Sequence, residues 1–319
     1  MALRGGIDLG GTKIQAAVVG ARNGVRGEAR VPTPKDGGPD GVLRAMADAI
    51  KSAAAQAKVQ TSDLDGVGIG SPGEVDSDAG TITNAYNVVP DWNRTISVAG
   101  TLQQELGTRI ALGNDVRVAT NAEFELGAGK PYASLLGVFW GTGVGGGVIL
   151  GGRPWRGRGD AGEIGHMVVR RNGAKCPCGR LGCMEAYAGR KAMELEARRR
   201  HHGGEKTALF KLMEKKGRTA LTSGVWADAL EDEDKLAVDL VERALAALGA
   251  GIASAVNLLD VEAVVIGGGL GTRLGDPYVT RIKEQMHPHL FVDARPPAVH
   301  VAALGDLGGA IGAALLVKS

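Results

Sequence analysis

The chain has 319 residues and a mass of 32.8 kDa, enough for one large hydrophobic core or two ordinary ones. Hydrophobic residues make up 44% and charged residues 23%, as in an ordinary globular protein, and the formal net charge is only +2. This charge balance excludes the strongly basic surface that long nucleic acids require, and no apolar run reaches membrane-spanning length. We therefore expect neither a nucleic acid nor a membrane as a partner.

The chain opens with a predicted β-hairpin. Residues Ile7 to Val19 read as two apolar strands joined by the turn Gly10-Gly11-Thr12-Lys13. Such a turn directs backbone N–H groups, a hydroxyl and an ammonium group toward one point, which suits phosphate oxygens. It is not a Walker A loop, because the string G-x-x-x-x-G-K-[ST] does not occur in the chain. An ordinary turn remains the alternative.

Strands and helices alternate after this hairpin. Residues 41–58 carry apolar side chains at helical spacing, and residues 67–75 read as a buried strand that ends in a Ser-Pro-Gly turn. This alternation predicts an α/β fold with a mostly parallel sheet. Functional sites in such sheets lie beyond the carboxyl ends of the strands, so residues 71–74 are a candidate rim.

A second strand end delivers two polar residues. The segment from Arg109 reads as a strand that ends in Asn114 and Asp115, where a helix begins. Asp115 could simply cap that helix. A carboxylate fixed at a strand end is also well placed to act as a general base.

Two further glycine-rich segments follow. Residues 135–150 repeat the opening pattern of strand, glycine turn (Gly141-Thr142-Gly143) and strand, which indicates two copies of one phosphate-binding unit. Gly267-Gly268-Gly269 follows the strand 261–266 and reads as a loop that could accept a base or ribose. A Rossmann fingerprint does not fit, because the spacing is not G-x-G-x-x-G and no complete strand–helix–strand opening is predicted there.

All three cysteines lie within eight residues, at positions 176, 178 and 183, and His166 precedes them by ten. Three thiolates and one imidazole complete the tetrahedral ligand set of a structural zinc ion. Gly179 and Gly182 would let so short a loop turn its sulfur atoms inward. Scattered buried cysteines beside an unrelated histidine are the alternative. Thiols placed for a metal indicate a reducing compartment, and the first residues lack a charged-then-apolar leader, so we expect a cytoplasmic protein.

The rest of the chain is mainly helical. Residues 190–234 are rich in charges, which is typical of solvated helix faces, and we assign this segment no function. Residues 235–259 form the longest predicted helix, with an apolar stripe at period 3.6, and residues 305–317 form the last one.

With these motifs in hand, the sequence resembles the ROK family (repressors, open reading frames and kinases), in particular its bacterial sugar kinases, over essentially the whole chain. Residues 8–13 and 141–143 resemble the two phosphate motifs, and 267–269 the adenosine motif. The string C-x-C-G-x-x-G-C-x-E from Cys176 to Glu185 fits the zinc signature at every defining position, and Glu163-x-Gly-His166 fits its companion.

The resemblance implies a two-lobed, actin-like ATPase fold (ribonuclease H-like) with duplicated β-hairpin phosphate motifs and a structural zinc loop. The smaller lobe would comprise residues 1–115 and 304–319, and the larger lobe residues 116–303. ATP with Mg²⁺ and a hexose would be the ligands, and the family suggests a homodimer.

The resemblance also implies residue roles. Asp115 would be the general base that takes the proton from the sugar 6-hydroxyl, and Asp8 would orient Mg²⁺ through water. Further sugar ligands would be Gly73, Asn87, Asn114, Glu163, His166 and Glu185. The nucleotide would be bound by Asp8, Gly10, Gly11, Thr12, Lys13, Gly141, Thr142, Gly143, Gly267, Gly268 and Gly269. The zinc ligands would be His166, Cys176, Cys178 and Cys183.

Several alternatives stay open at this point. Family repressors carry a helix-turn-helix domain before the first glycine motif, and here that motif begins at Asp8. Glucose is the preferred acceptor, but N-acetylglucosamine, N-acetylmannosamine, mannose, fructose or allose could use the same ligands, and polyphosphate could replace ATP. A zinc-knuckle binding module without catalysis would leave the paired glycine hairpins unexplained.

Overall fold

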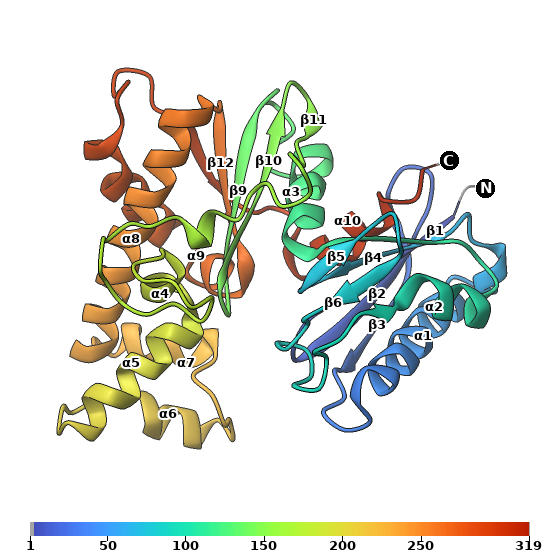
Figure 1. The fold of residues 1–319 in the computed structure, drawn as a ribbon, viewed down its shortest axis with the longest axis horizontal. Helices are drawn as coiled ribbons and strands as arrows, with labels where there is room; N and C mark the ends of the chain where they lie inside the picture. The colour runs from blue at the N-terminus through green and yellow to red at the C-terminus, as the bar shows by residue number, and fades with distance from the viewer. Residues whose placement is uncertain (1–2, 319) are drawn as a thin grey trace. The chain divides into compact units, whose positions relative to one another are not determined.

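The computed structural model describes residues 3–318, and the chain divides into two compact units (Figure 1). One unit runs up to Gly127 and includes the segment from Ala303 onward, and the other spans Ala128–Ala302. Each unit has its own five-stranded sheet and its own hydrophobic core. Within residues 3–318, no helix is both long and apolar enough to cross a bilayer.

The first unit is built on the sheet β3-β2-β1-β4-β8. Neighbouring strands are antiparallel from β3 to β1 and parallel from β1 to β8. The strands are β1 (Arg4–Leu9), β2 (Lys13–Val19), β3 (Val25–Pro32), β4 (Val67–Ser71) and β8 (Ile110–Asn114). A small antiparallel sheet contains β5 (Glu74–Asp76), β6 (Thr81–Thr83) and β7 (Ile96–Ser97). The helices are α1 (Gly38–Gln56), α2 (Val98–Leu106), α3 (Asp115–Leu126) and α10 (Gly308–Ala314), with short 3₁₀ turns at Thr61–Asp63 and Gly305–Leu307.

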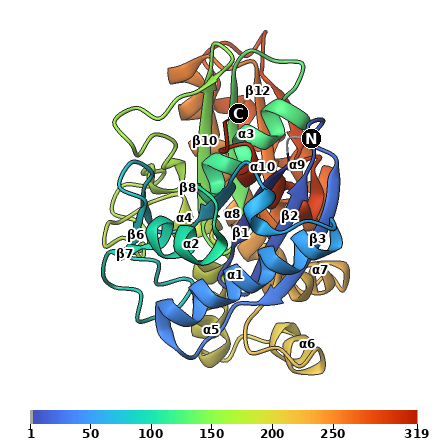
Figure 2. The same cartoon turned by 90° about the vertical axis from the view of Figure 1, so that its right-hand side faces the viewer.

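Helices cover both faces of the first sheet, and α1 lies across β2 and β3 (Figure 2). The face of β1 that carries Gly5 meets Ile50 of α1, and the face that carries Gly6 meets α10. A Cβ atom on Gly6 would lie 1.9 Å from the carbonyl oxygen of Ala310, so only glycine lets the last helix pack this closely. The predicted C-terminal helix is therefore present, but it is shorter than residues 305–317.

The second unit repeats the topology of the first. Its sheet has the order β11-β10-β9-β12-β13, again antiparallel from β11 to β9 and parallel from β9 to β13. The strands are β9 (Leu135–Trp140), β10 (Val144–Leu150), β11 (Arg153–Pro154), β12 (Ala263–Gly267) and β13 (Ala298–Val301). The repetition confirms that the two glycine hairpins belong to two copies of one unit.

Most of the helical residues lie in the second unit. The helices are α4 (Glu185–Ala188), α5 (Arg190–His202), α6 (Leu209–Lys215), α7 (Ser223–Glu231), α8 (Lys235–Leu259) and α9 (Gly268–Met286), with short 3₁₀ turns at Ile164–His166 and His287–His289. Figure 1 shows α5, α6 and α7 gathered at one end of this unit, beyond its strands. The apolar stripe of α8, including Leu240, Leu248 and Ile252, is buried in the core of this unit, as its periodicity predicts.

Two features differ from the sequence-based expectation. The units divide after α3 rather than at residue 115, because α3 packs against α10 and β4 of the first sheet. Residues 267–269 do not form a loop, since Gly267 ends β12 and α9 begins at Gly268. Gly268 turns the chain within one residue, with a φ of 82° and close contact to the backbone of Trp140. Strands β12 and β13 pair in parallel and α9 connects them, so this region contains a strand–helix–strand unit that the sequence did not predict.

Candidate functional site

The first glycine hairpin joins β1 to β2, and the N–H of Gly10 donates to the carbonyl of Lys13 at 3.0 Å to close its turn. A Cβ atom on Gly11 would lie 2.3 Å from the carbonyl oxygen of Asn87, so glycine is required there. The ammonium of Lys35 donates to the carbonyls of both Gly11 and Val88. The structure thus brings Asn87, a predicted sugar ligand, against the predicted phosphate hairpin.

Two charged groups of this hairpin face the C-terminal segment of the chain. The Nζ atom of Lys13 lies 3.5 Å from Oδ1 of Asp306, which is largely exposed. Burial raises the pKa of Asp8 to about 6, although Lys13 opposes the shift and Asp306 adds to it. A desolvated carboxylate is a hard oxygen group of the kind that Mg²⁺ prefers, so Asp8 fits the predicted role beside a hydrated magnesium ion.

Strands β4 and β8 end side by side, with Ser71 paired to Asn114 in the parallel ladder. Oδ1 of Asn114 accepts hydrogen bonds from the N–H groups of Val116 (3.2 Å) and Arg117 (3.1 Å), so Asn114 is the N-cap of α3. The simple interpretation of Asp115 as the N-cap is therefore wrong. Asp115 is the first residue of the helix, and its Oδ1 accepts from the Val116 N–H at 2.9 Å. Both side chains are partly exposed at the carboxyl end of the sheet.

The rim after β4 is a tight turn. Gly73 has a φ of 91°, and a Cβ atom there would lie 2.8 Å from the carbonyl oxygen of Thr83. Beyond it, Oε1 of Glu74 accepts a hydrogen bond from Nδ2 of Asn84 at 3.0 Å. The segment that contains Asn87 is thereby tied to the end of β4.

The four predicted zinc ligands meet in the second unit. Their donor atoms all lie within 4.8 Å of one another. Sγ of Cys178 is 3.7 Å from Sγ of Cys183, and Sγ of Cys176 is 3.8 Å from Nδ1 of His166. Tetrahedral zinc with Zn–S bonds of about 2.3 Å separates two sulfur ligands by roughly 3.8 Å, so the donor set fits this ion. Gly179 and Gly182 adopt φ values of 88° and 83°, which confirms that glycine is needed at these turns.

The two predicted carboxylates flank this cluster. Oε2 of Glu163 lies 4.0 Å from Nε2 of His166, on the side of the ring opposite the cysteines. Carboxylates commonly hydrogen-bond a metal-ligating imidazole, and Glu163 lies near His166 but beyond hydrogen-bond distance. On the other side, Oε1 of Glu185 lies 4.0 Å from Sγ of Cys176.

The second glycine hairpin lies next to Glu185. Oε2 of Glu185 accepts a hydrogen bond from the N–H of Val144 at 2.8 Å, and a Cβ atom on Gly143 would lie 2.2 Å from the same oxygen. On the far side of the hairpin, the Cβ position of Gly141 lies 3.7 Å from the N atom of Gly269. The zinc-type cluster, Glu185 and two predicted nucleotide motifs are therefore contiguous within one unit.

One polar residue near these motifs belongs to no motif of the sequence. Arg190, the first residue of α5, donates from Nη2 to the hydroxyl of Thr142 at 3.0 Å. It opens the charged segment to which we assigned no function, and no motif distinguishes it from the arginines that follow.

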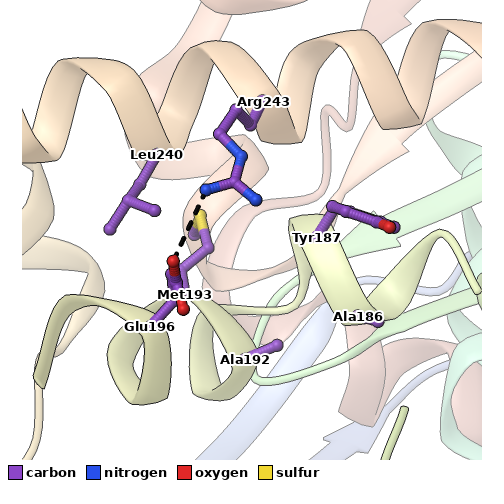
Figure 3. A pocket seen from close by; sticks show the side chains of 7 residues that line it. All are labelled: Ala186, Tyr187, Ala192, Met193, Glu196, Leu240 and Arg243. Atoms are coloured by element: carbon purple, nitrogen blue, oxygen red, sulfur yellow. Dashed lines mark ion pairs between the residues drawn. The ribbon is translucent and has the colours of Figure 1, made fainter. Parts of the chain in front are cut away.

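A small surface pocket also occurs in the second unit, between α4, α5 and α8 (Figure 3). An ion pair between Arg243 and Glu196, with 3.6 Å between Nη1 and Oε1, lies at this pocket. None of its lining residues is a predicted site residue; they are Ala186, Tyr187, Ala192, Met193, Glu196, Leu240 and Arg243.

The duplicated sheet, with a glycine hairpin in each copy and a zinc-type cluster beside the second, defines an α/β protein of the actin-like ATPase fold. The model of the ROK family matches residues 4–319. The chain belongs to the ROK family.

Three similar proteins illustrate this relationship. The "Glucokinase" of Halalkalibacterium halodurans is 32% identical over 98% of this chain and 94% of its own length. An N-acetyl-D-glucosamine kinase of Pectobacterium atrosepticum is 31% identical over 98% of this chain and 97% of its own length. The crystal structure of a ROK family glucokinase from Streptomyces griseus, in complex with glucose and AMPPNP, superposes with a TM-score of 0.83 at 32% identity, covering 99% of each chain.

Proposed function

We propose that this chain is an ATP-dependent hexokinase that transfers the γ-phosphate of ATP to the 6-hydroxyl of glucose and forms glucose 6-phosphate. The observation that carries the proposal is full-length similarity, at 32% identity, to a glucokinase whose structure holds glucose and an ATP analogue. The glycine hairpins and the strand-end carboxylate described above supply the groups that such a reaction needs.

Asp115 is the proposed general base. It lies at the carboxyl end of β8 in the first turn of α3, where the sheet and the Asn114 cap fix its backbone. Its carboxylate takes the proton from the 6-hydroxyl as that oxygen attacks the γ-phosphorus. With its Oδ1 occupied by two backbone N–H groups, Asn114 offers its side-chain NH₂ group as a donor to a sugar hydroxyl.

The donor phosphates are the proposed ligands of the glycine turns. Gly10, Gly11 and Thr12 offer backbone N–H groups and a hydroxyl, and Lys13 exchanges its contact with the exposed Asp306 for a phosphate oxygen. Bound Mg²⁺ would neutralise charge on the phosphates, and Asp8 would hold its water shell. In the second unit, residues 141–143 and the N-terminus of α9 at residues 267–269 complete the nucleotide ligands.

Sugar recognition is proposed for Gly73, Asn87, Glu163, His166 and Glu185 in addition to Asn114. Carboxylates and imidazoles that are fixed by a metal site discriminate hydroxyl configurations, because a misplaced hydroxyl leaves buried polar groups unpaired. Zinc bound by His166 and the three cysteines would be structural, since four protein ligands leave no position for a water nucleophile. It would hold Glu163 and Glu185 in place.

A coupled assay of ADP release over a panel of sugars tests the proposal. Glucose should give the highest kcat/KM, and a flat response to every sugar would remove the kinase assignment. The similarity to an N-acetyl-D-glucosamine kinase makes an N-acetylated hexose the second candidate, so the panel includes N-acetylglucosamine and N-acetylmannosamine with mannose, fructose and allose. Parallel reactions with polyphosphate test the donor. We further propose a cytoplasmic homodimer, which sedimentation analysis and cell fractionation would test.

A further inference from the structure

The first turn of α5 packs against the second glycine hairpin. The N–H of Arg190 donates to the carbonyl of Gly141 at 3.1 Å, and the N–H of Lys191 donates to the carbonyl of Thr142 at 3.0 Å. The Cβ position of Gly189 lies only 3.4 Å from the Cα atom of Gly143. Because α5 binds these two carbonyl oxygens, they do not point free toward an anionic ligand, and the hydroxyl of Thr142 is the side-chain polar group of the turn.

The Arg190 side chain links the hairpin to the start of α7. Its Nη1 donates to the carbonyl of Leu221 at 2.8 Å, while its Nη2 donates to Oγ1 of Thr142 at 3.0 Å. Two residues after Leu221, the hydroxyl oxygen of Ser223 lies 3.4 Å from the Cβ position of Gly269. The guanidinium therefore joins segments that surround the predicted nucleotide motifs at residues 141–143 and 267–269.

The charge of Arg190 has no carboxylate partner within ion-pair distance among residues 3–318. The carboxylate of Glu194, one turn later, is instead occupied by Arg198 at 2.7 Å and by the N–H of Leu221 at 2.9 Å. Burial lowers the pKa of Arg190, with Glu194 opposing the shift, but an arginine stays protonated. A partly buried cation at a glycine turn, with no carboxylate in ion-pair contact among the described residues, matches an anionic ligand.

We infer that Arg190 binds the phosphate donor: its guanidinium fixes the Thr142 hydroxyl and places a positive charge beside the phosphate chain. The inference rests on the proposed function and deepens it, because it adds a nucleotide ligand outside the glycine motifs. Two of the five N–H groups of the guanidinium donate to Leu221 and Thr142, which leaves three to donate to the phosphates.

Calorimetric titration with AMPPNP, in the presence of Mg²⁺, tests this inference on the full chain. Arg190→Gln should weaken AMPPNP binding about 10- to 100-fold, which is typical of a lost charge-assisted hydrogen bond, and should leave glucose affinity within about 2-fold. Arg190→Lys keeps the charge but cannot reach both partners, so its affinity should lie between those of Arg190→Gln and wild type. Arg199→Gln is the matched control, because Arg199 lies on the exposed side of α5 and pairs with Glu196.

A double-mutant cycle with Thr142→Ala measures how much of the effect of Arg190 on AMPPNP affinity passes through the Thr142 hydroxyl. Coupling of Arg190 to Thr142 predicts that the double variant loses less AMPPNP affinity than the sum of the two single changes. If Arg190→Gln lowers Tm, the AMPPNP affinity of the folded Arg190→Lys variant is compared with that of wild type instead. Unchanged AMPPNP affinity in both Arg190 variants would overturn the inference. A wild-type protein that binds AMPPNP through Arg190 but phosphorylates no sugar would instead refute the proposed function alone.

Discussion

The carboxylate of Glu185 accepts a hydrogen bond from the backbone N–H of Val144, with 2.8 Å between Oε2 and N. Val144 is the first residue of β10, directly after the second glycine turn, and Glu185 is the first residue of α4, two residues beyond the last predicted zinc ligand. One side chain thus ties the cysteine loop to a predicted phosphate hairpin. A residue placed in this way is expected to affect both substrates.

We therefore expect Glu185→Ala to raise KM for glucose and KM for ATP together, each by about 10-fold or more, because the Val144 N–H loses a charged acceptor. Glu185→Gln keeps an acceptor oxygen and should show a smaller effect on ATP. Glu163→Gln is the control, since Glu163 faces His166 instead of the hairpin, and it should change KM for glucose alone. Steady-state kinetics with each substrate varied in turn provide the measurement. An ATP dependence identical to that of wild type in Glu185→Ala would contradict the link.

Replacement of Asp115 tests the proposed base. Asp115→Asn should lower kcat about 10²- to 10⁴-fold, because the 6-hydroxyl no longer has a proton acceptor, while the Kd for glucose changes only slightly. Glu125, an exposed residue of the same helix, provides the control variant Glu125→Gln, which should behave as wild type. Quench-flow turnover and calorimetric glucose binding are measured on the same preparations. Turnover that survives in Asp115→Asn would rule out this residue as the base.

Zinc binding should release protons. In the metal-free protein, burial raises the pKa of Cys176 to about 12 and also raises the pKa of Cys183. Burial also raises the pKa of Cys178, but hydrogen bonds, first of all from the Arg180 backbone, outweigh it and lower that pKa to about 6. At pH 7.5 we expect about two protons released per zinc ion, from Cys176 and Cys183, and an affinity that rises with pH. Calorimetry in two buffers of different ionisation enthalpy measures the release.

Removal of zinc should lower both stability and sugar affinity. The variant Cys178→Ser is expected to bind zinc more weakly, to melt at a lower temperature and to lose glucose affinity, because Glu163 and Glu185 lose their support. Metal analysis of the purified wild-type chain should find about one zinc per chain. A metal-free protein with full glucose affinity would exclude this supporting role.

The pKa of Asp8 predicts opposite effects of pH on stability and activity. The folded protein holds the proton more tightly than the unfolded chain does, with pKa values of about 6 and 3.8. Stability from this group is therefore greatest below about pH 4 and is lost as pH rises through 6. The Tm of Asp8→Asn, relative to wild type, should increase between pH 4 and pH 7. Activity with Mg²⁺ and ATP should rise over the same range, because the carboxylate must be ionised. A Tm difference independent of pH would contradict the shift.

Glu123 is expected to stabilise the point where the chain re-enters the first unit. Its carboxylate is buried, with 3% exposure, and accepts from the N–H groups of Ala303 (3.0 Å) and Leu304 (2.9 Å). Glu123→Ala leaves both groups without this acceptor and should cost about 2–4 kcal/mol in the free energy of unfolding. Glu123→Gln should cost less, and Glu125→Ala almost nothing. Urea denaturation gives these values, and hydrogen exchange at residues 303 and 304 should quicken in Glu123→Ala.

Local patterns in the sequence determined most of the elements and the cluster of predicted zinc ligands. Strand–turn–strand patterns at residues 7–19 and 135–150 predicted the two hairpins, and the cysteine spacing with His166 predicted a cluster that the structure brings together. Glycine spacing, apolar periodicity and thiol spacing are properties of short segments, so the chain alone displays them.

Contacts between distant segments were decided by the tertiary structure. Only the structure shows that Asn114, and not Asp115, caps α3, and that α9 begins at Gly268. Two long-range contacts likewise depend on the fold: Glu185 with Val144, and Arg190 with Thr142. No local pattern separates Arg190 from the other arginines of the same helix. The difference is a hydrogen bond to Thr142, in a hairpin 48 positions away in the chain, and such a contact is a property of packing, which sequence periodicity does not encode.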